Sequence, residues 1–392
     1  MKLIRKTLLI TFIVSLSQLT LAAGVEDLYS AAVQVSDQSS TQRQKSFSRA
    51  LAKVLIKTTG NKDIMAHPGV SQALAQANNY MVKYAYLTVP SVSSFEKQPA
   101  SEASHSTRVT AAQMPQDVLL SVQFAKASVD ELIRTLGLPI WPSNRPQILV
   151  WVVEQTASGY RFVETDDRPE SLESSFEYRG LPFQLPLYDL DDQLALNPLA
   201  AWSLNQQQLR EAAQRYGVDH WVVLRYSQLS GGGVRGSWYL SGRKKDFAGD
   251  RALLNTLQAA TNEEFLSACV DQIVDRFARQ MSYFANAEAS LFRLVVENIG
   301  NFTAFTQLNN FLEGLEIVNA VKVRSIDGDT LVLDLATEGE SRVLLRALNK
   351  ESRLSRVVQV GDDAVEPSAM SPLSSPSIPG TSLHHFRWQA AR

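Results

Sequence analysis

Two polar stretches divide this chain of 392 residues and limit the size of any single core that it can form. Residues 91–113 are rich in Ser, Ala and Thr and lack apolar periodicity, and residues 361–392 begin with a run rich in Pro and Ser. Such segments bury too little apolar surface to offset the entropy that is lost on ordering. We therefore predict a disordered insertion at 91–113, a disordered tail at 361–392, and folded modules in the remaining sequence.

The remaining sequence shows apolar residues at strand and helix periods, which predicts the α+β fold class with three small mixed modules. We expect an α+β module over residues 24–137 and an α/β sandwich over residues 138–287. In residues 288–360 the predicted order is strand, helix, strand, strand, helix, strand, and Asp327-Gly328 marks the hairpin. That order is typical of a ferredoxin-like module.

Residues 1–23 have the pattern of a secretory signal peptide. Three basic residues come first, an apolar run over 8–21 follows, and Ala22 and Ala23 mark a cleavage site. The apolar run is short for a membrane span, and no later segment is long and apolar enough to be one. We expect export to the periplasm and no transmembrane anchor after the signal is cleaved.

Charge and cysteine content exclude several classes of protein. The chain has 38 Lys and Arg against 40 Asp and Glu, without a basic run, so we expect no nucleic-acid partner. Cys269 is the one cysteine, which excludes an internal disulfide, and its place on an apolar helical stripe predicts a buried, unreactive thiol. No cofactor is expected.

One glycine motif could be mistaken for a nucleotide site. Gly231, Gly233 and Gly236 match the G-x-G-x-x-G spacing, but that fingerprint requires a helix directly after the loop. The sequence here continues as a strand, so we interpret the glycines as a hairpin.

The candidate ligand-binding residues lie in the middle module: Asp189, Asp191, Trp202 and His220. Clustered carboxylates can bind Ca²⁺ or Mg²⁺, but the further ligands of a calcium loop are missing, and capping carboxylates are the simpler interpretation. Tryptophans concentrate in this region and could line a groove for a small ligand, whereas His220 could equally be at the edge of a core. We predict no catalytic residue and no metal site.

The end of the chain is unusual because aromatic residues and an arginine follow a polar linker. Phe386, Arg387 and Trp388 are residue types that dominate protein-binding hot spots, so they are candidate partner-binding residues. The alternative is an unstructured terminus.

Several motifs resemble an uncharacterised family of gammaproteobacterial periplasmic proteins that is grouped as a domain of unknown function. They span residues 50–60, 137–146, 179–186 and 215–219, and the resemblance covers about residues 25–360. That family has no assigned activity, so the resemblance implies no catalytic residues. More loosely, the helix that ends in Gly-Val-Asp219 before a buried strand is similar to the amino-terminal domain of the Tol-Pal propeller protein.

Together these features favour a non-enzymatic envelope adaptor or protein-binding scaffold, whose partner is a periplasmic or envelope protein. The alternative is a cofactor-free periplasmic hydrolase or small-ligand-binding protein that uses the middle module. Gathering of Asp191, His220 and an arginine around one cleft would support that alternative. A third hypothesis is metal handling through His384 and His385.

Overall fold

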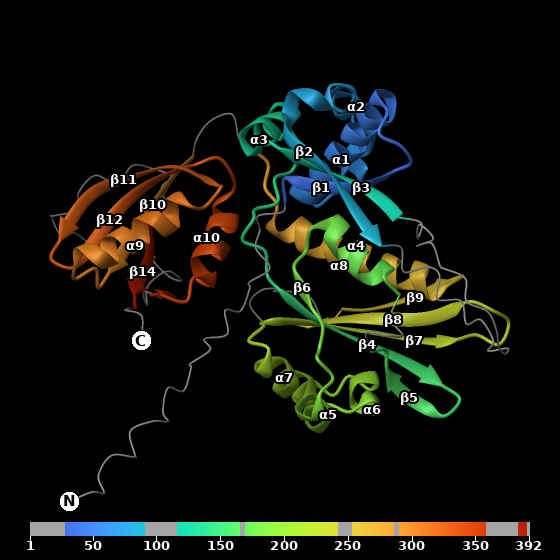
Figure 1. Ribbon diagram of the computed structural model, residues 1–392. Helices are drawn as coiled ribbons and strands as arrows, with labels where there is room; N and C mark the ends of the chain where they lie inside the picture. Colours follow the sequence, from blue (N-terminus) through green and yellow to red (C-terminus); the bar gives the residue numbers. More distant parts are fainter. Residues whose placement is uncertain are drawn as a thin grey trace, which may run out of the picture.

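The computed structural model contains three β-sheets, each packed against helices, which confirms the α+β class (Figure 1). The predicted signal peptide and the predicted insertion at 91–113 lie outside the residues that the structure describes. The described ranges are 28–90, 116–164, 169–241, 253–285, 290–357 and 383–389.

The first sheet is antiparallel and has the order β1-β3-β2. Its strands are β1 (Ser30–Val35), β2 (Met81–Pro90) and β3 (Gln116–Phe124). The helices beside it are α1 (Ser40–Thr59), α2 (Pro68–Ala75) and α3 (Lys126–Thr135). α2 ends at Ala75, and Met81 begins β2.

The outer edge of β1 is closed by side chains of α1. Three basic residues spaced four apart reach the carbonyl oxygens of alternate residues of β1: Arg49 donates to Gln34 at 3.2 Å, Lys53 to Ala32 at 2.8 Å and Lys57 to Ser30 at 3.2 Å. Charged side chains at a sheet edge prevent another strand from pairing there. Within the described residues, β2 is therefore the edge of this sheet that remains open.

Both ends of α1 follow local signals in the sequence. The Ser39 side chain accepts a hydrogen bond from the Gln42 N–H at 3.2 Å, and Gly60 ends the helix in the left-handed conformation with φ 66°. Gly60 is also packed tightly, since a Cβ there would lie 2.5 Å from the Trp141 ring and 2.6 Å from Ala278. Gly60 therefore lies where α1, the linker and the long helix α8 (Asn262–Met281) meet.

Gly60→Ala is expected to lower the free energy of unfolding by about 2–4 kcal/mol, because it adds overpacking to left-handed strain. Gly217→Ala is the matched control. Gly217 has φ 63° but open space around its Cβ position, so its substitution should cost only about 1 kcal/mol. Urea denaturation of both variants measures the difference, and equal losses would contradict the packing role of Gly60.

The middle sheet has the order β5-β4-β7-β8-β9, with β6 paired to β4. Its strands are β4 (Ile148–Thr156), β5 (Gly159–Phe162), β6 (Phe183–Gln184), β7 (His220–Gln228), β8 (Val234–Ser241) and β9 (Leu253–Ala259). β4 and β7 run parallel, and the first seven residues of β4 are buried, as its continuous apolar run predicts. The glycine motif lies in the β7–β8 hairpin, which confirms that interpretation.

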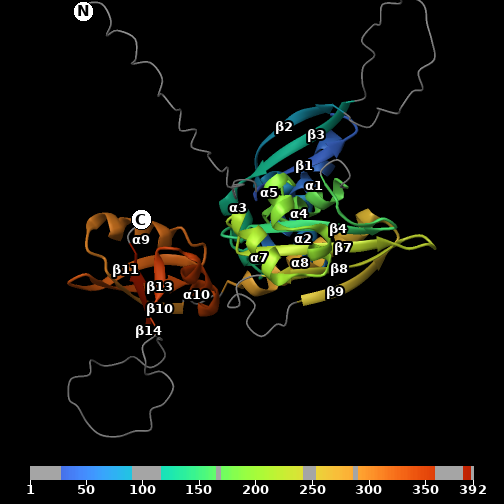
Figure 2. The same ribbon diagram turned by 90° about the horizontal axis from the view of Figure 1, so that it is seen from below.

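Helices cover both faces of the middle sheet (Figures 1 and 2). One face packs against α4 (Ser171–Arg179) and α8, and the other against α5 (Leu190–Ala195), α6 (Pro198–Trp202) and α7 (Gln206–Arg215). α7 is capped by Asn205, whose side chain accepts a hydrogen bond from the Gln208 N–H. The sequence did not predict β9, α4, α5 or α6.

The third sheet has the order β11-β12-β10-β14-β13. Its elements are β10 (Ser290–Glu297), α9 (Phe302–Glu313), β11 (Val318–Asp327), β12 (Thr330–Thr337), α10 (Ser341–Lys350), β13 (Leu354–Arg356) and β14 (Leu383–Trp388). The hairpin at Asp327-Gly328 is confirmed.

The ferredoxin-like prediction is not confirmed, because β14 lies between β10 and β13. β14 runs parallel to β10, whereas the last strand of a β-α-β-β-α-β unit would pair there in the opposite direction. The physical reason is burial: β13 has three residues and buries Leu354, whereas β14 buries both Phe386 and Trp388. The prediction of a disordered tail is therefore wrong for residues 383–388.

The cores of the first and third sheets are continuous. Buried residues of both sheets belong to one cluster, joined through Leu138, Ile140, Tyr283, Leu315 and Ile317. Figures 1 and 2 show the third sheet beside the other two, with α3 and α10 on the sides that meet. Among the described helices, none has the length and hydropathy required to cross a bilayer.

Candidate functional site

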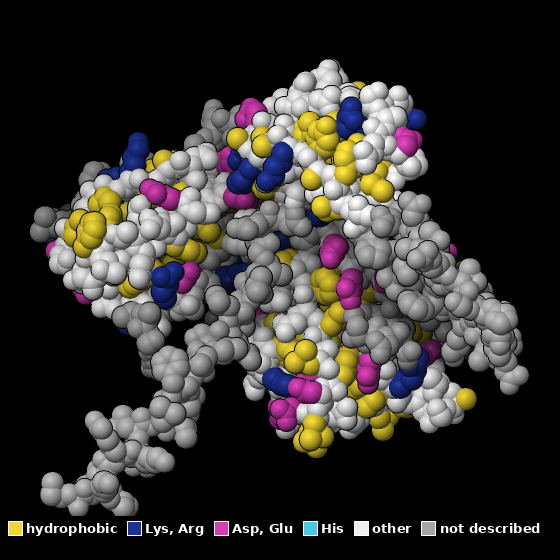
Figure 3. Space-filling view, viewed as in Figure 1, with side chains coloured by type: hydrophobic (Ala, Val, Ile, Leu, Met, Phe, Trp, Pro, Cys, Tyr) yellow, Lys and Arg dark blue, Asp and Glu magenta, His cyan; other side chains and the backbone are white. Residues whose placement is uncertain are grey.

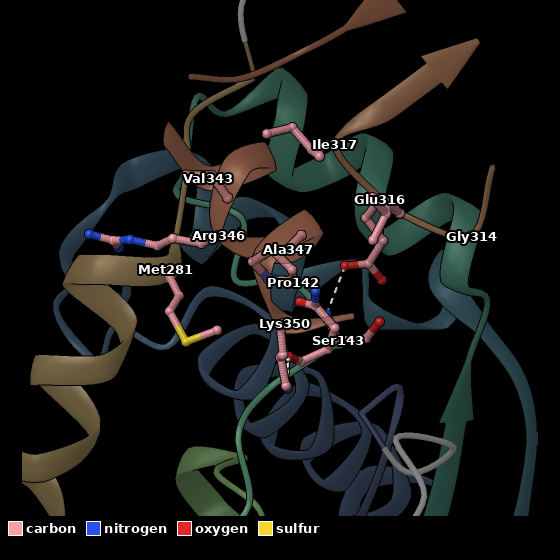
Figure 4. Close-up of a pocket in the computed structure, with 12 residues that line it drawn as sticks. Pro142, Ser143, Met281, Gly314, Glu316, Ile317, Val343, Arg346, Ala347 and Lys350 are labelled. Atoms are coloured by element: carbon pink, nitrogen blue, oxygen red, sulfur yellow. Dashed lines mark hydrogen bonds between the residues drawn. The ribbon is translucent and has the colours of Figure 1, made fainter. Parts of the chain in front are cut away.

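One hollow that borders charged side chains lies at the seam between the third sheet and the rest of the molecule (Figure 4). On one side are the α9–β11 loop and α10, and on the other are the linker around Ser143 and the end of α8. Arg346 and Lys350 come from α10, and Glu316 comes from the loop. The volume is about 60 Å³.

Glu316, in the loop before β11, is bound by two groups from across this seam. One carboxylate oxygen accepts the Ser143 N–H at 2.9 Å, shown dashed in Figure 4, and the other lies 3.1 Å from the Lys126 ammonium. Lys350 donates to the carbonyl of Asn144 at 2.7 Å, and Arg346 donates to the carbonyl of Gln280. Each charged group in the hollow therefore holds the third sheet to the other two.

Glu338 makes a second ionic contact across the same seam. Arg134 of α3 binds its buried carboxylate with two hydrogen bonds of 2.8 and 2.9 Å, and the Tyr283 hydroxyl donates to it at 2.8 Å. Burial alone would raise the pKa of Glu338, but the hydrogen bonds and charge of Arg134, together with the hydrogen bond from Tyr283, hold it below the ordinary 4.5. The same environment raises the pKa of Tyr283 through burial and the nearby charge of Glu338.

The seam has the properties of a joint rather than a ligand site. Sites for small molecules usually enclose about 300–1,000 Å³, whereas this hollow has room for only a few water molecules. Its charged groups already have partners within the protein.

Glu338→Gln is expected to lower stability by about 1–2 kcal/mol at pH 7, because it removes a charged acceptor from Arg134. The folded pKa lies below the unfolded one, so the stability contributed by Glu338 is present above about pH 4.5 and is lost as the pH falls through the folded pKa. The wild type should therefore lose stability more steeply than the variant between about pH 5 and 3. Parallel pH dependences would contradict this.

Glu340→Gln is the matched control, since the Glu340 side chain is half exposed and its ion pair with Arg342 lies on the surface. Urea denaturation across this pH range should show a change of less than about 0.5 kcal/mol for the control.

The acidic cluster of the middle module is a capping structure, as one interpretation of the sequence predicted. Asp189 caps α5 through the Asp192 N–H at 3.1 Å, and Arg215 binds Asp189 with two hydrogen bonds of 2.5 Å. The hydrogen bonds from Arg215 lower the pKa of Asp189 to about 2. Asp192 is buried and accepts hydrogen bonds from Arg215, from the Tyr216 hydroxyl and from the Tyr188 N–H.

The other predicted ligand-binding residues do not join this cluster. His220 lies at the start of β7 and packs edge-on against Phe277 of α8, on the sheet face opposite α5 and α7. The Trp202 ring packs against Tyr160 and Arg225, towards the other end of β7. Asp191 and His220 therefore do not gather around one cleft with an arginine, the arrangement that would support a hydrolase or ligand-binding protein, because alternate residues of a strand point to opposite faces.

Of the candidate partner-binding residues, Phe386 and Trp388 have their rings buried in the core of the third sheet, so neither ring lies on the surface. Arg387 is exposed and pairs with Glu297 at 2.9 Å. Cys269 is buried, as predicted, and burial raises the pKa of its thiol. Among the described residues, no group of three or more His, Cys, Asp or Glu side chains is placed to hold a metal ion.

Exposed apolar side chains occur on all three sheets and their helices, which the sequence did not indicate (Figure 3). The first sheet exposes Val82, Tyr84 and Leu87 on β2, the α5–α6 segment exposes four leucines, and the third sheet exposes Phe302 and Ile326. The last two residues border an open hollow of about 360 Å³. A pattern search could have found the leucines, because Leu187, Leu190 and Leu194 have helical spacing beside the acidic cluster.

Comparison with known proteins finds one domain model that is similar to part of this sequence. A family model described as "Domain of unknown function (DUF8605)" matches residues 22–142. This region resembles a domain whose activity is not known. The match contains the motif at 50–60 and the start of the one at 137–146, whereas those at 179–186 and 215–219 lie outside it.

The other comparisons assign no activity. No curated protein matches the chain. A solved structure titled "Crystal structure of uncharacterized protein" has 14% sequence identity and a TM-score of 0.14, and the match covers 35% of this chain and 92% of that one. A score this low supports no assignment of fold.

Proposed function

We propose that this protein is exported to the periplasm and acts there as a non-catalytic, protein-binding scaffold of the cell envelope. The observation that carries the proposal is that each of the three sheets, with its helices, exposes more than one large apolar side chain. Monomeric proteins usually expose apolar side chains singly, and grouped ones mark sites of interaction. Three separate surfaces suit an adaptor that holds more than one partner.

The joints between the sheets support the same proposal. Glu316 and Glu338 hold the third sheet against α3 and the linker. The groups that bind them are Arg134 of α3 and the Ser143 N–H of the linker. Fixed geometry between binding surfaces lowers the entropic cost of binding several partners at once.

Crosslinking in intact cells tests this proposal. The full chain with a carboxyl-terminal affinity tag is crosslinked, purified from the periplasmic fraction and compared with an unrelated tagged periplasmic protein. We expect reproducible enrichment of at least one envelope protein. A folded, exported chain that enriches no protein over the control would contradict the scaffold function, and retention in the cytoplasm would contradict export.

A further inference from the structure

The segment of α5 and α6 has its polar and apolar sides reversed relative to a normal surface helix. A surface helix buries its apolar face and exposes its charges. In α5 the carboxylate of Asp192 points inward and is buried, while Leu190 and Leu194 point outward with exposed fractions of 68% and 77%. Leu187 and Leu199 on either side are 72% and 57% exposed. We call these four leucines the leucine surface.

The reversal is fixed by specific bonds to Asp192. Its two carboxylate oxygens accept from Arg215 at 2.7 Å, from the Tyr216 hydroxyl at 2.5 Å and from the Tyr188 N–H at 2.8 Å. Rotation of α5 to bury the leucines would break all three bonds and leave the Tyr216 hydroxyl without this acceptor. Tyr188 also has a positive φ of 54°, which is uncommon for a residue other than glycine. The fold therefore holds the leucines outward.

The charge around the leucine surface is negative. Residues 181–209 contain three aspartates and no Lys, Arg, His or Glu. Asp189 and Asp192 are bound to Arg215, whereas the Asp191 side chain is 78% exposed and lies 3.9 Å from the Arg215 guanidinium. Arg225 also lies beside this segment, since its guanidinium packs on the Trp202 ring and donates to the Trp202 carbonyl. Two guanidinium groups against three carboxylates leave net negative charge beside the leucines. Figure 3 shows hydrophobic and acidic side chains at this end of the molecule, together with some Lys or Arg side chains.

We propose that the leucine surface binds a partner protein through an apolar groove that is flanked by Lys or Arg side chains. This inference rests on the proposed scaffold function and names the partner's chemistry at one of its surfaces. Exposed leucines at helical spacing fit a hydrophobic groove, and the basic rim complements Asp191. Anionic lipid does not fit, because surface helices that bind it carry Lys and Arg rather than Asp. A second copy does not fit, because a two-fold axis would bring like charges together.

Site-specific photocrosslinking in the full, exported chain tests this inference. The photoreactive amino acid p-benzoyl-phenylalanine replaces Leu194, and in a control chain it replaces Leu291, an exposed leucine on β10. We expect an adduct with another protein at position 194 at least fivefold above position 291. Mass spectrometry should place the crosslink in a peptide with apolar residues and with Lys or Arg close by.

Two variants then test the apolar and the charged parts of the contact. Asp191→Lys should reduce the adduct yield at least fivefold, whereas Asp327→Lys on the β11–β12 hairpin should leave it unchanged. With the crosslinked protein purified, the double variant Leu190→Ser and Leu194→Ser should raise Kd 10–100-fold, and Leu291→Ser should change it less than twofold.

Several outcomes would overturn the inference. They are an adduct with lipid or with a second copy, equal yields at positions 194 and 291, no adduct from a folded and exported chain, or a protein adduct that is insensitive to Asp191→Lys. If bulk crosslinking still recovers a partner in such a case, only the leucine surface is excluded. If it recovers none, the scaffold function fails as well.

Discussion

Replacement of Phe386 by alanine is expected to lower the free energy of unfolding of the third sheet by about 3–5 kcal/mol. Phe386 is fully buried in the middle of β14, between Val296 of β10 and Arg356 of β13. Its removal leaves a cavity in the core beneath α9 and α10, which the surrounding structure can fill only in part. Urea denaturation followed by circular dichroism measures the loss.

Arg387→Ala is the control for this prediction. Arg387 is next to Phe386 in β14, but its side chain is exposed and its ion pair with Glu297 lies on the surface. The loss should be below about 1 kcal/mol. Equal, small losses for both variants would show that β14 is not part of the core. Truncation of the chain after Val360 would remove β14, which is an interior strand of the third sheet. Loss of binding by such a truncated chain would therefore report unfolding of this sheet.

Arg179→Met is expected to destabilise the protein by about 3 kcal/mol. The Arg179 side chain is completely buried and donates to Asp271 at 2.5 Å, to the carbonyl of Gly60 at 3.0 Å, and to Asp275. Methionine has similar length but cannot donate hydrogen bonds, so the Gly60 carbonyl at the end of α1 would remain buried without this donor. The same change removes the hydrogen bonds by which Arg179 joins α4 to α8 and to the end of α1.

Arg210→Met provides the comparison, since Arg210 is exposed on α7. We expect a change within about 0.5 kcal/mol for it. Denaturation midpoints of the two variants measure the difference, and an Arg179→Met protein as stable as the control would contradict a structural role for this arginine.

Elements with local signals could be predicted from the sequence. Ser39 and Gly60 bound α1 because a cap and a left-handed stop act within a few residues. The Asp327-Gly328 hairpin and the continuous apolar run of β4 were predicted on the same basis. The helix caps and the hairpin turn depend on interactions between residues that are close in the sequence. The burial of β4 on both faces is indicated by the apolar composition of that strand alone.

Elements that depend on distant partners could not be predicted. β14 pairs with β10, which lies about 90 residues earlier in the sequence. A Pro- and Ser-rich stretch precedes β14, so the sequence around it does not indicate this pairing. α5 was not predicted, because proline residues interrupt the apolar residues around it and its inward position is Asp192 rather than an apolar residue. The sequence could not show which helices cover each face of β7. The position of those helices determines that the His220 side chain faces Phe277 rather than Asp189.

The scaffold function is tested most directly by crosslinked purification of the full chain in parallel with one variant for each apolar surface. The variants are Val82→Ser with Leu87→Ser, Leu190→Ser with Leu194→Ser, and Phe302→Ser with Ile326→Ser, each confirmed to be folded by circular dichroism. We predict that the wild-type chain enriches envelope proteins and that each variant loses a different subset of them. Enrichment of no protein by the wild type, or the same set of proteins for the wild type and all three variants, would contradict a scaffold that binds through these surfaces.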